Sequence, residues 1–251
     1  MYQDLDGKAA IVTGAGRGIG EAIARKLADQ GAKVLVADLS GDEKAVAESI
    51  GGNARSYSVD ISSSDSVAGM VEAAIEHFGT VDVLVNNAGI DGGYFPAADC
   101  TIENFDRTVA VNLRGTFLAL HHTLPVMLRQ GRGSIVNVSS LAALMPFPGM
   151  LAYATTKSGI LAMTRCAAAD HGKAGVRVNA VLPGVIETPM YTNLQDTHPE
   201  VHAGLAFQAT LTPIGRSGTG DEVANTVAFL ASDASSYITG ASMKIDGGLS
   251  G

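Results

Sequence analysis

Lys8-Ala-Ala-Ile-Val-Thr-Gly-Ala-Gly-Arg-Gly-Ile-Gly20 decides the fold of this 251-residue chain. Its apolar run, residues 9–12, predicts a strand buried on both faces, and the residues after Gly20 carry apolar side chains at helical spacing. Between strand and helix the glycines follow the pattern G-x-x-x-G-x-G, at Gly14, Gly18 and Gly20. A turn without Cβ atoms at a helix N-terminus presents bare N–H groups to which a pyrophosphate can bind. Read alone, the turn is equally compatible with a glycine-rich loop that holds no ligand.

The second predicted strand, Lys33–Asp38, ends in an acidic residue 18 positions after Gly20. In a strand–helix–strand unit, this spacing places the Asp38 carboxylate where it can accept hydrogen bonds from the 2′-hydroxyl of a bound ribose. A 2′-phosphate there would meet a like charge, so Asp38 favours NAD over NADP as the cofactor. Arg17, in the glycine turn, argues the other way because a guanidinium can pair with a phosphate. Arg17 can equally bind the pyrophosphate or lie over solvent, so Asp38 carries more weight.

The length and composition of the chain fit one domain that spans residues 1–251. Apolar residues make up 46% of the chain, yet no apolar run approaches membrane-spanning length. The N-terminus lacks the features of a signal peptide, and we therefore expect a cytoplasmic protein with no membrane partner. The formal net charge of −8, without any cluster of Lys and Arg, argues against nucleic acid as a partner. Cys100 and Cys166 have no ligand spacing and are expected to be buried thiols.

Predicted strands and helices alternate along the chain, which is typical of a parallel sheet covered by helices on both faces. We therefore expect an α/β fold with a Rossmann-type doubly wound sheet of about seven strands. The expected strands are 9–12, 33–38, 54–59, 81–85, 134–138, 176–182 and 242–245. A helix follows the first strand, and further helices are expected at 42–50, 62–78, 102–129 with a bend near Pro125, 151–172 and 221–230. Residues 185–220 have a looser pattern and are predicted to form a lid over the substrate.

Polar residues and glycines gather where the predicted strands end. In open α/β sheets, ligands bind outside the carboxyl ends of the strands. Six of these ends carry such groups: Gly14–Gly20, Asp38, Asp60, Asn86-Asn87, Ser139-Ser140 and Pro183–Thr188. A shared ligand site explains this coincidence better than independent structural roles do.

Tyr153 and Lys157 lie four residues apart on the helix predicted after the fifth strand, so their side chains share one helix face. An unperturbed phenol titrates near pH ~10, too high for acid–base work at neutral pH. The neighbouring ammonium is expected to lower the pKa of Tyr153. Ser140 ends the adjoining strand, and its hydroxyl can hold the substrate oxygen that Tyr153 protonates. Taken alone, such a pair is also typical of a packed aromatic residue and a solvated lysine.

The sequence resembles the classical short-chain dehydrogenase/reductase family over nearly its whole length. The motifs that carry the resemblance are Thr13-Gly-Ala-Gly-Arg-Gly-Ile-Gly20, Asn86-Asn-Ala-Gly89, Asn112 in Val-Asn-Leu, Ser140, Tyr153-Ala-Thr-Thr-Lys157 and Pro183-Gly-Val-Ile-Glu-Thr188. The combination is specific, although no single motif is. It implies an oxidoreductase that transfers a hydride between a secondary alcohol or its ketone and a nicotinamide cofactor, which Asp38 predicts to be NAD.

The resemblance also implies roles for single residues. Tyr153 would be the general acid/base, Lys157 would bind the nicotinamide ribose and lower the pKa of Tyr153, and Ser140 would orient the substrate oxygen. Asn112 would hold a water that continues a proton relay from Lys157 to solvent. The family's spacing to the tyrosine favours Ser140 over Ser139. Besides Tyr153 and Lys157, the implied cofactor contacts are Gly14, Arg17, Gly18, Ile19, Gly20, Asp38, Asp60, Ile61, Asn86, Ala88, Gly89, Pro183, Gly184, Ile186 and Thr188.

No metal site is expected. His198 and His202 are spaced as in a zinc site, but no convincing third ligand follows them. His121 and His122 are expected to be packing or surface residues. The resemblance further implies a homotetramer, in which the predicted helices at 104–129 and 153–172 pair with copies of themselves.

The residues expected around the substrate are mostly apolar. They are Leu144, Met145, Phe147 and Met150 on one wall, Met190, Tyr191, Leu194, Leu205 and Phe207 on the opposite wall, and the edge Asp91-Gly-Gly-Tyr-Phe95. Since the two walls contain no Arg or Lys, they favour a compact apolar, cyclic or aromatic secondary alcohol over an anionic substrate. Two alternatives stay open. One is an NADPH-dependent 3-oxoacyl-acyl-carrier-protein reductase, against which Asp38 argues, and the other is a non-catalytic nucleotide-binding scaffold.

Overall fold

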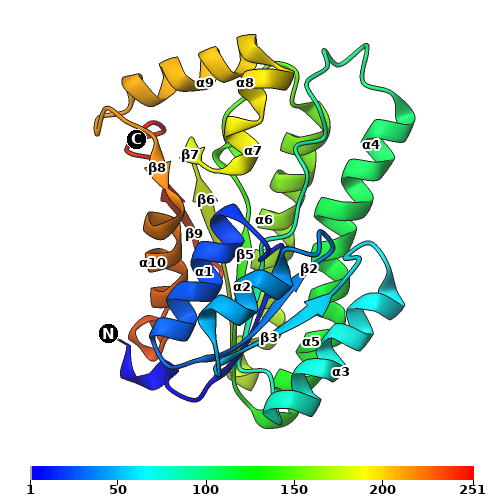
Figure 1. The fold of residues 1–251 in the computed structure, drawn as a ribbon, viewed down its shortest axis with the longest axis vertical. Coiled ribbons are helices and arrows are strands. Elements are labelled where there is room, and N and C mark those ends of the chain that lie inside the picture. Colours follow the sequence, from blue (N-terminus) through cyan, green and yellow to red (C-terminus); the bar gives the residue numbers. More distant parts are fainter. Residues whose placement is uncertain (1) are drawn as a thin grey trace.

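A seven-stranded sheet forms the centre of the computed structural model, which describes residues 2–251 (Figure 1). The strands in their order across the sheet are β3 (Ala54–Ser58), β2 (Lys33–Asp38), β1 (Ala9–Thr13), β4 (Val83–Asn86), β5 (Gly133–Val138), β6 (Val176–Pro183) and β9 (Ser242–Ile245). Neighbouring strands run parallel, and Ile11 of β1 lies between Leu35 of β2 and Leu84 of β4. The strand order reverses direction at β1 and β4, which is the place where open α/β sheets bind ligands. The predicted Rossmann-type fold is confirmed.

Helices cover both faces of the sheet (Figure 1). One face carries α1 (Gly18–Asp29), α2 (Glu43–Ile50) and α10 (Gly220–Ala231). The opposite face carries α3 (Ser64–Phe78), α5 (Gly115–Gln130) and α6 (Leu151–His171). Successive strand residues enter opposite cores, as Ile11 and Val12 do, because their side chains alternate across the sheet. Both faces are buried, and the strands therefore read as unbroken apolar runs.

The single helix expected over residues 102–129 is divided in the structure. It consists of α4 (Ile102–Thr108), the π-helical turn η2 (Val109–Arg114) and α5. Pro125 lies inside α5, which continues to Gln130, so the interruption falls earlier than the expected bend. A π-helical turn inserts an extra residue into the helical repeat and occurs often at functional sites. Here the turn contains Asn112.

The segment at residues 185–220 contains more regular structure than its loose pattern predicts. It forms β7 (Ile186–Glu187), α7 (Pro189–Thr192), α8 (Leu194–Thr197), α9 (Pro199–Leu211) and β8 (Gly218–Thr219). The strand β7 pairs in parallel with β8. Proline occupies the first position of both α7 and α9, where its missing N–H costs no helical hydrogen bond. Short helical turns are η1 (Gln3–Leu5), η3 (Leu141–Ala143), η4 (Gly172–Ala174) and η5 (Asp233–Ser235).

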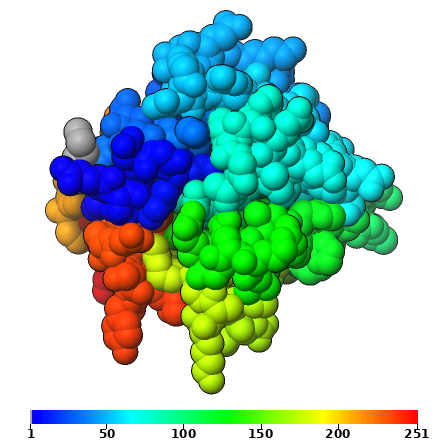
Figure 2. All heavy atoms as spheres, turned by 90° about the horizontal axis from the view of Figure 1, so that it is seen from below, coloured from blue at the N-terminus to red at the C-terminus, as the bar shows by residue number. Residues whose placement is uncertain are grey.

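The two ends of the sheet differ in what covers them. At the carboxyl ends of the strands lies the segment that contains α7, α8 and α9 (Figure 1). Figure 2 looks at the other end, where the N-terminal segment, coloured blue, lies beside segments coloured cyan and green. The strands run from this end toward α7–α9, and the polar residues that follow them therefore meet beneath those helices.

The expectation of two buried thiols is wrong for Cys166, which is exposed, and Cys100 is only partly buried. The buried positions of α6 include Ile160, Thr164 and Ala168, and Cys166 lies off this stripe on the face turned away from the sheet. None of the helices in residues 2–251 is long and apolar enough to cross a membrane.

Candidate active site

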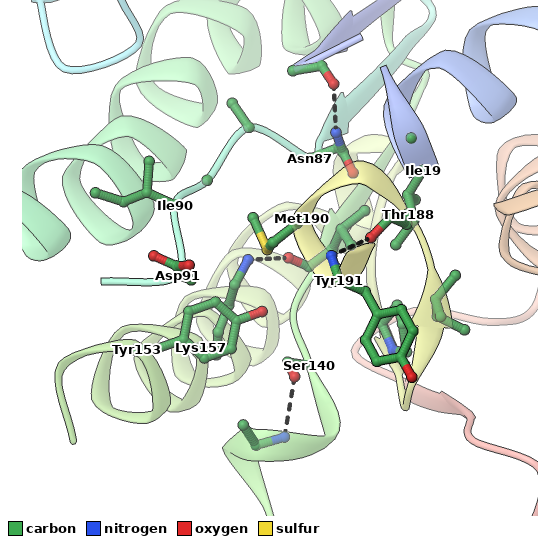
Figure 3. Close-up of a pocket in the computed structure, with 18 of the residues that line it drawn as sticks. Ile19, Asn87, Ile90, Asp91, Ser140, Tyr153, Lys157, Thr188, Met190 and Tyr191 are labelled. Atoms are coloured by element: carbon green, nitrogen blue, oxygen red, sulfur yellow. Dashed lines mark hydrogen bonds between the residues drawn. The ribbon is translucent and has the colours of Figure 1, made fainter. Parts of the chain in front are cut away.

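A cleft of about 640 Å³ lies at the carboxyl ends of the strands, beside α7 and α9 (Figure 3). Most of the predicted site residues line it: Gly14, Arg17, Gly18, Ile19, Asp38, Asp60, Ile61, Ala88, Gly89, Ser140, Tyr153, Lys157, Pro183, Gly184, Ile186 and Thr188. Three predicted residues do not line the cleft, namely Gly20, Asn86 and Asn112. The strand ends therefore do form one site.

The glycine turn between β1 and α1 forms one end of the cleft. Gly14 and Gly18 have φ values of +64° and +60°, which glycine adopts without strain. Arg17 precedes α1, and its side chain forms no capping hydrogen bond with the helix. The first N–H groups of α1 therefore have no partner from the Arg17 side chain. Gly20 has a different role, because a Cβ there would collide with the carbonyl oxygen of Gly14. Gly20 does not line the cleft, and its missing side chain lets α1 pack against the turn; its predicted contact with the cofactor stays a prediction.

Asn87, and not Asn86, reaches the cleft. Its backbone N–H donates to Thr13 Oγ1 (3.1 Å), and its amide donates to the carbonyl oxygens of Thr13 (3.0 Å) and Gly14 (2.9 Å). These bonds tie the segment after β4 to the glycine turn. Asn86 is buried, and its amide donates to Asn137 of β5 (2.8 Å). Adjacent residues of an extended chain point in opposite directions, and this rule identifies which of the two asparagines can face a ligand.

Asp38 is held in place by three backbone N–H groups. Its carboxylate accepts from Gly16 (2.9 Å), Leu39 (2.8 Å) and Ser40 (2.9 Å). Burial works against ionisation of this carboxyl group, but these hydrogen bonds outweigh burial and hold its pKa below the usual value. The end of β2 therefore presents a fixed negative charge to the cleft at neutral pH.

Tyr153 and Lys157 extend from the first turns of α6 into the cleft (Figure 3). Lys157 Nζ donates to the carbonyl oxygen of Val138 (2.9 Å) and lies 5.5 Å from the centre of the Tyr153 ring. The Ser139 hydroxyl donates to the carbonyl oxygen of Lys157 (2.8 Å) and so fastens α6 to β5. Ser140 Oγ accepts from the N–H of Ala142 (3.1 Å), which leaves its proton to donate elsewhere. This arrangement favours Ser140 over Ser139 as the residue that holds a substrate oxygen.

Burial controls the ionisation of both side chains. Burial raises the pKa of the Tyr153 phenol, hydrogen bonding with Ser140 opposes this in part, and the negative charge of Asp91 adds to the increase. Burial also lowers the pKa of Lys157 to about 8. The expectation that Tyr153 has a lowered pKa is therefore wrong for this structure, because loss of hydration is the largest influence on the phenol and the influence that opposes it is the hydrogen bond with Ser140.

Asn112 lies beneath the cleft, where the π-helical turn places it. Its side chain accepts from the N–H of Ile90 (2.8 Å) and donates to the carbonyl oxygen of Ile90 (2.9 Å) and to Thr156 (3.2 Å). At Gly89, a Cβ would lie 3.1 Å from the Asn112 oxygen and 3.5 Å from Lys157 Nζ. Asn112 therefore fixes the loop beside Lys157. Its predicted part in a proton relay stays a prediction.

The apolar walls are built from fewer of the expected residues than the sequence indicates. Phe147, Met150, Met190, Tyr191, Leu194 and Leu205 line the cleft, together with Asp91 and Tyr94. Leu144, Met145, Phe95 and Phe207 do not, and of these Leu144, Phe95 and Phe207 are exposed. In α9, Leu205 faces the cleft whereas Phe207 points to solvent, because only one side of the helix faces the cleft. Leu249, near the C-terminus, also lines the cleft, and no local pattern in the sequence indicates this contact.

The paired histidines pack against tyrosines. The ring of His198 lies 5.2 Å from that of Tyr94, and the ring of His202 lies 4.7 Å from that of Tyr191, measured between ring centres. Within residues 2–251, no group of three or more His, Cys, Asp and Glu side chains is placed to hold a metal ion. These histidines therefore connect α9 and the turn before it to tyrosines that line the cleft.

Comparisons with known proteins agree with this geometry. A family model described as enoyl-(acyl carrier protein) reductase matches residues 14–250. A 3-oxoacyl-acyl-carrier-protein reductase of Thermotoga maritima is 39% identical over 249 residues, which cover 98% of this chain and 98% of the relative. A 2,5-dichloro-2,5-cyclohexadiene-1,4-diol dehydrogenase of Sphingobium indicum is 38% identical over 248 residues, again 98% of each chain. The crystal structure of a 3-ketoacyl-(acyl-carrier-protein) reductase from Brucella melitensis, complexed with NADH, matches with a TM-score of 0.91 and 37% identity, covering 98% of this chain and 99% of that one.

Proposed function

This chain belongs to the classical short-chain dehydrogenase/reductase family, and from that premise we propose that it is an NAD-dependent oxidoreductase acting on an apolar secondary alcohol or its ketone. Enzymes of this family bind a nicotinamide cofactor. The observation that carries the proposal is the convergence of Ser140, Tyr153 and Lys157 in one cleft with the fixed carboxylate of Asp38. We further propose that residues 185–220 act as a lid, since Met190, Leu194 and Leu205 from this segment form part of the cleft wall.

The shape of the cleft suits a dinucleotide. At Gly14 a Cβ would lie 2.7 Å from Ala88 Cα, so the missing side chain lets the glycine turn pack against the segment after β4. Gly14 and Gly89 both line the cleft without side chains, so a ligand can approach their backbone closely. The residues that would hold the dinucleotide are the glycine turn and Arg17 at the pyrophosphate, Asp38 at the adenosine ribose, Asp60, Ile61 and Ala88 around the adenosine, Lys157 at the nicotinamide ribose and Thr188 at the carboxamide. When bound, the nicotinamide supplies the hydride for ketone reduction or accepts it in alcohol oxidation.

The side chains of the cleft can handle the accompanying proton. In oxidation the Tyr153 phenolate accepts the proton of the alcohol, and in reduction the phenol returns a proton to the oxygen of the former ketone. Ser140 donates a hydrogen bond to the same oxygen, which carries negative charge in the transition state. Lys157 uses one proton on Val138, and its ammonium keeps two more for the ribose and the phenol. The raised pKa of Tyr153 keeps the phenol protonated, so that it can donate its proton to the substrate oxygen during ketone reduction.

The identity of the substrate is proposed from the walls of the cleft. Phe147, Met150, Met190 and Leu205 are apolar, and of the described lining residues only Arg17 and Lys157 are basic. This lining favours a compact cyclic or aromatic alcohol over a phosphorylated or carboxylate substrate. The name of the Sphingobium relative, a cyclohexadienediol dehydrogenase, agrees with this class. The names of the reductases from Thermotoga and Brucella keep a 3-oxoacyl-carrier-protein substrate as the second candidate.

Initial rates with NAD and NADP test the proposal. We expect turnover of cyclohexanol and 1-phenylethanol with NAD, and a lower kcat/KM for sugar phosphates and for 3-hydroxyacyl thioesters. A higher kcat/KM for the thioesters with NADP would establish the second candidate instead. Binding of NAD without turnover of any alcohol or thioester would point to a nucleotide-binding scaffold, although the chain keeps Asn112, Ser140, Tyr153 and Lys157.

Asp38 is expected to set the choice of cofactor. Replacing Asp38 with Ala should raise the kcat/KM for NADP relative to that for NAD by about 10- to 100-fold, because the charge that repels the 2′-phosphate and accepts from the ribose is lost. Asp38→Asn keeps an acceptor for the N–H of Gly16 and separates the loss of charge from a change in the turn. The exposed Asp42, changed to Ala, serves as the control. An unchanged ratio in both Asp38 variants would contradict this role.

We also propose a homotetramer. Its support is that α5, from the region expected to pair with a second copy, exposes the large apolar side chain of Phe117. The expected cytoplasmic location stays a prediction from the sequence.

A further inference from the structure

Asp91 brings a carboxylate to the substrate end of the cleft. Of the described acidic residues that line the cleft, Asp38 ends β2 and Asp60 follows β3, whereas Asp91 lies beside Tyr153 and Lys157 (Figure 3). Its negative charge contributes to the raised pKa of both Tyr94 and Tyr153. The carboxylate is therefore close to the place where the substrate oxygen meets the phenol.

The loop that carries Asp91 is fixed on both sides. Asn112 holds both backbone groups of the preceding residue, Ile90, and the N–H of Phe95 donates to Gly149 (2.9 Å). One Asp91 oxygen, Oδ1, accepts from the N–H of Gly93 (3.1 Å). The other oxygen has no hydrogen-bond donor within residues 2–251, and no basic side chain of this range lies within 4.0 Å of the carboxylate. Asp91 thus has a defined position and an unused acceptor.

Asp91 is half-buried and lines the cleft, so a substrate that displaces water from it has to offer a hydrogen-bond donor in place of that water. Neither of the basic residues that line the cleft in the described part of the chain forms an ion pair with Asp91: Lys157 Nζ donates to Val138, and Arg17 lies at the glycine turn. A hydroxyl group of the substrate fits this need. An ammonium group fits less well, because it would also meet the charge of Lys157, and a carboxylate or phosphate would be repelled by Asp91.

We propose that Asp91 determines substrate specificity by accepting a hydrogen bond from a second hydroxyl group, so that the preferred substrates are cyclic diols or the corresponding hydroxyketones. This inference rests on the proposed function, since it assigns the substrate class of the same cleft. The apolar walls select the ring, Tyr153 and Ser140 hold the reacting oxygen, and Asp91 holds the other hydroxyl.

The test compares kcat/KM for the cyclohexanediols with kcat/KM for cyclohexanol. In the wild type, the best diol is expected to exceed cyclohexanol by about 10- to 100-fold, the range for a hydrogen bond to a charged group. Asp91→Asn should lower this ratio by about tenfold, because Asn keeps an acceptor for the N–H of Gly93 but has no charge. The same variant should raise kcat/KM for trans-4-hydroxycyclohexanecarboxylate relative to cyclohexanol by about 3- to 10-fold, since the repulsion is removed.

Asp99→Asn is the matched control, because Asp99 is an exposed acid of the same loop that does not line the cleft. It should keep the wild-type ratio. An equal ratio in the wild type and Asp91→Asn would overturn the proposal, as would a higher kcat/KM for 4-aminocyclohexanol than for any diol. If neither cyclohexanol nor any diol is turned over, it is the proposed function that fails.

Discussion

Tyr153→Phe is expected to lower kcat by about 10²- to 10⁴-fold, the usual contribution of a general acid/base, while the dissociation constant for NAD changes by no more than about twofold. The substitution removes only the phenolic oxygen. The half-buried ring lines the cleft, and phenylalanine fills the same space. Initial rates with cyclohexanol and NAD give kcat, and a titration monitored by protein or NADH fluorescence gives the cofactor affinity.

The pH profile provides a second measurement for Tyr153. Because burial raises the pKa of its phenol, alcohol oxidation in the wild type should become faster as pH rises toward that pKa and the phenolate forms. In Tyr153→Phe the residual rate should lose this dependence. Tyr57→Phe is the matched control, since Tyr57 packs beside Gly69 outside the cleft and its hydroxyl serves no proposed chemistry. A kcat close to the wild-type value in Tyr153→Phe would mean that Tyr153 is only a packed aromatic residue.

The fold follows from local patterns, and this is why the sequence predicts it well. Strands such as β1 and β2 are short apolar runs bounded by glycine or acid, and parallel pairing requires both faces to be buried. The motifs at the strand ends then meet of necessity, because parallel strands share one carboxyl edge. Asp38 and Ser140 could be assigned to one site on this argument, whereas the assignment of Tyr153, on α6, rests on its pairing with Lys157 and on the family resemblance.

The remaining errors concern features that depend on packing in three dimensions. The π-helical turn at Val109–Arg114 contains no glycine or proline, so no local sequence signal predicts it. In this turn Asn112 forms hydrogen bonds with Ile90. Leu249 lines the cleft although it lies far along the chain from the other lining residues, and such a contact depends on the folded structure. The pKa of Tyr153 was expected to fall on account of a neighbour four residues away, yet burial is a property of the folded environment and it dominates.

Asp91 is a residue whose proposed function could not be predicted from the sequence. An acid in a loop is normally solvated, and the sequence places Asp91 only on an edge rich in aromatic residues. The hydrogen bonds from Asn112 to Ile90 hold the loop so that Asp91 lies beside Tyr153. Asp91 thereby adds a negative charge to a cleft whose walls are otherwise mostly apolar.

Lys157→Met is expected to lower kcat/KM for alcohol oxidation by about 10²- to 10³-fold, the cost of removing one preorganised donor, and to weaken NAD binding, which Tyr153→Phe should not do. Methionine fills the volume of the lysine stem but offers no proton to the ribose or the phenol.

A folding defect is not the expected cause of this loss of activity in Lys157→Met. The pKa of Lys157 is about 8 in the folded protein and 10.5 in its ordinary state, so the unfolded chain holds this proton more tightly. The penalty for burying the ammonium is full below pH 8 and disappears as pH rises toward 10.5. At pH 7 the methionine variant should therefore unfold at the same temperature as the wild type or at a higher one.

The pH dependence of cofactor affinity distinguishes the charge of Lys157 from its packing. As pH rises through about 8, the wild-type ammonium loses its proton, and the dissociation constant for NAD should increase. In Lys157→Met the dissociation constant should be higher than in the wild type at pH 7 and should no longer change through this range. Isothermal titration calorimetry gives the dissociation constant for NAD of both proteins at pH 8 and at about 1.5 units below and above it, pH 6.5 and 9.5. If both proteins showed the same pH dependence, the titrating group would lie elsewhere, and Lys157 would act on NAD only through the shape of its side chain.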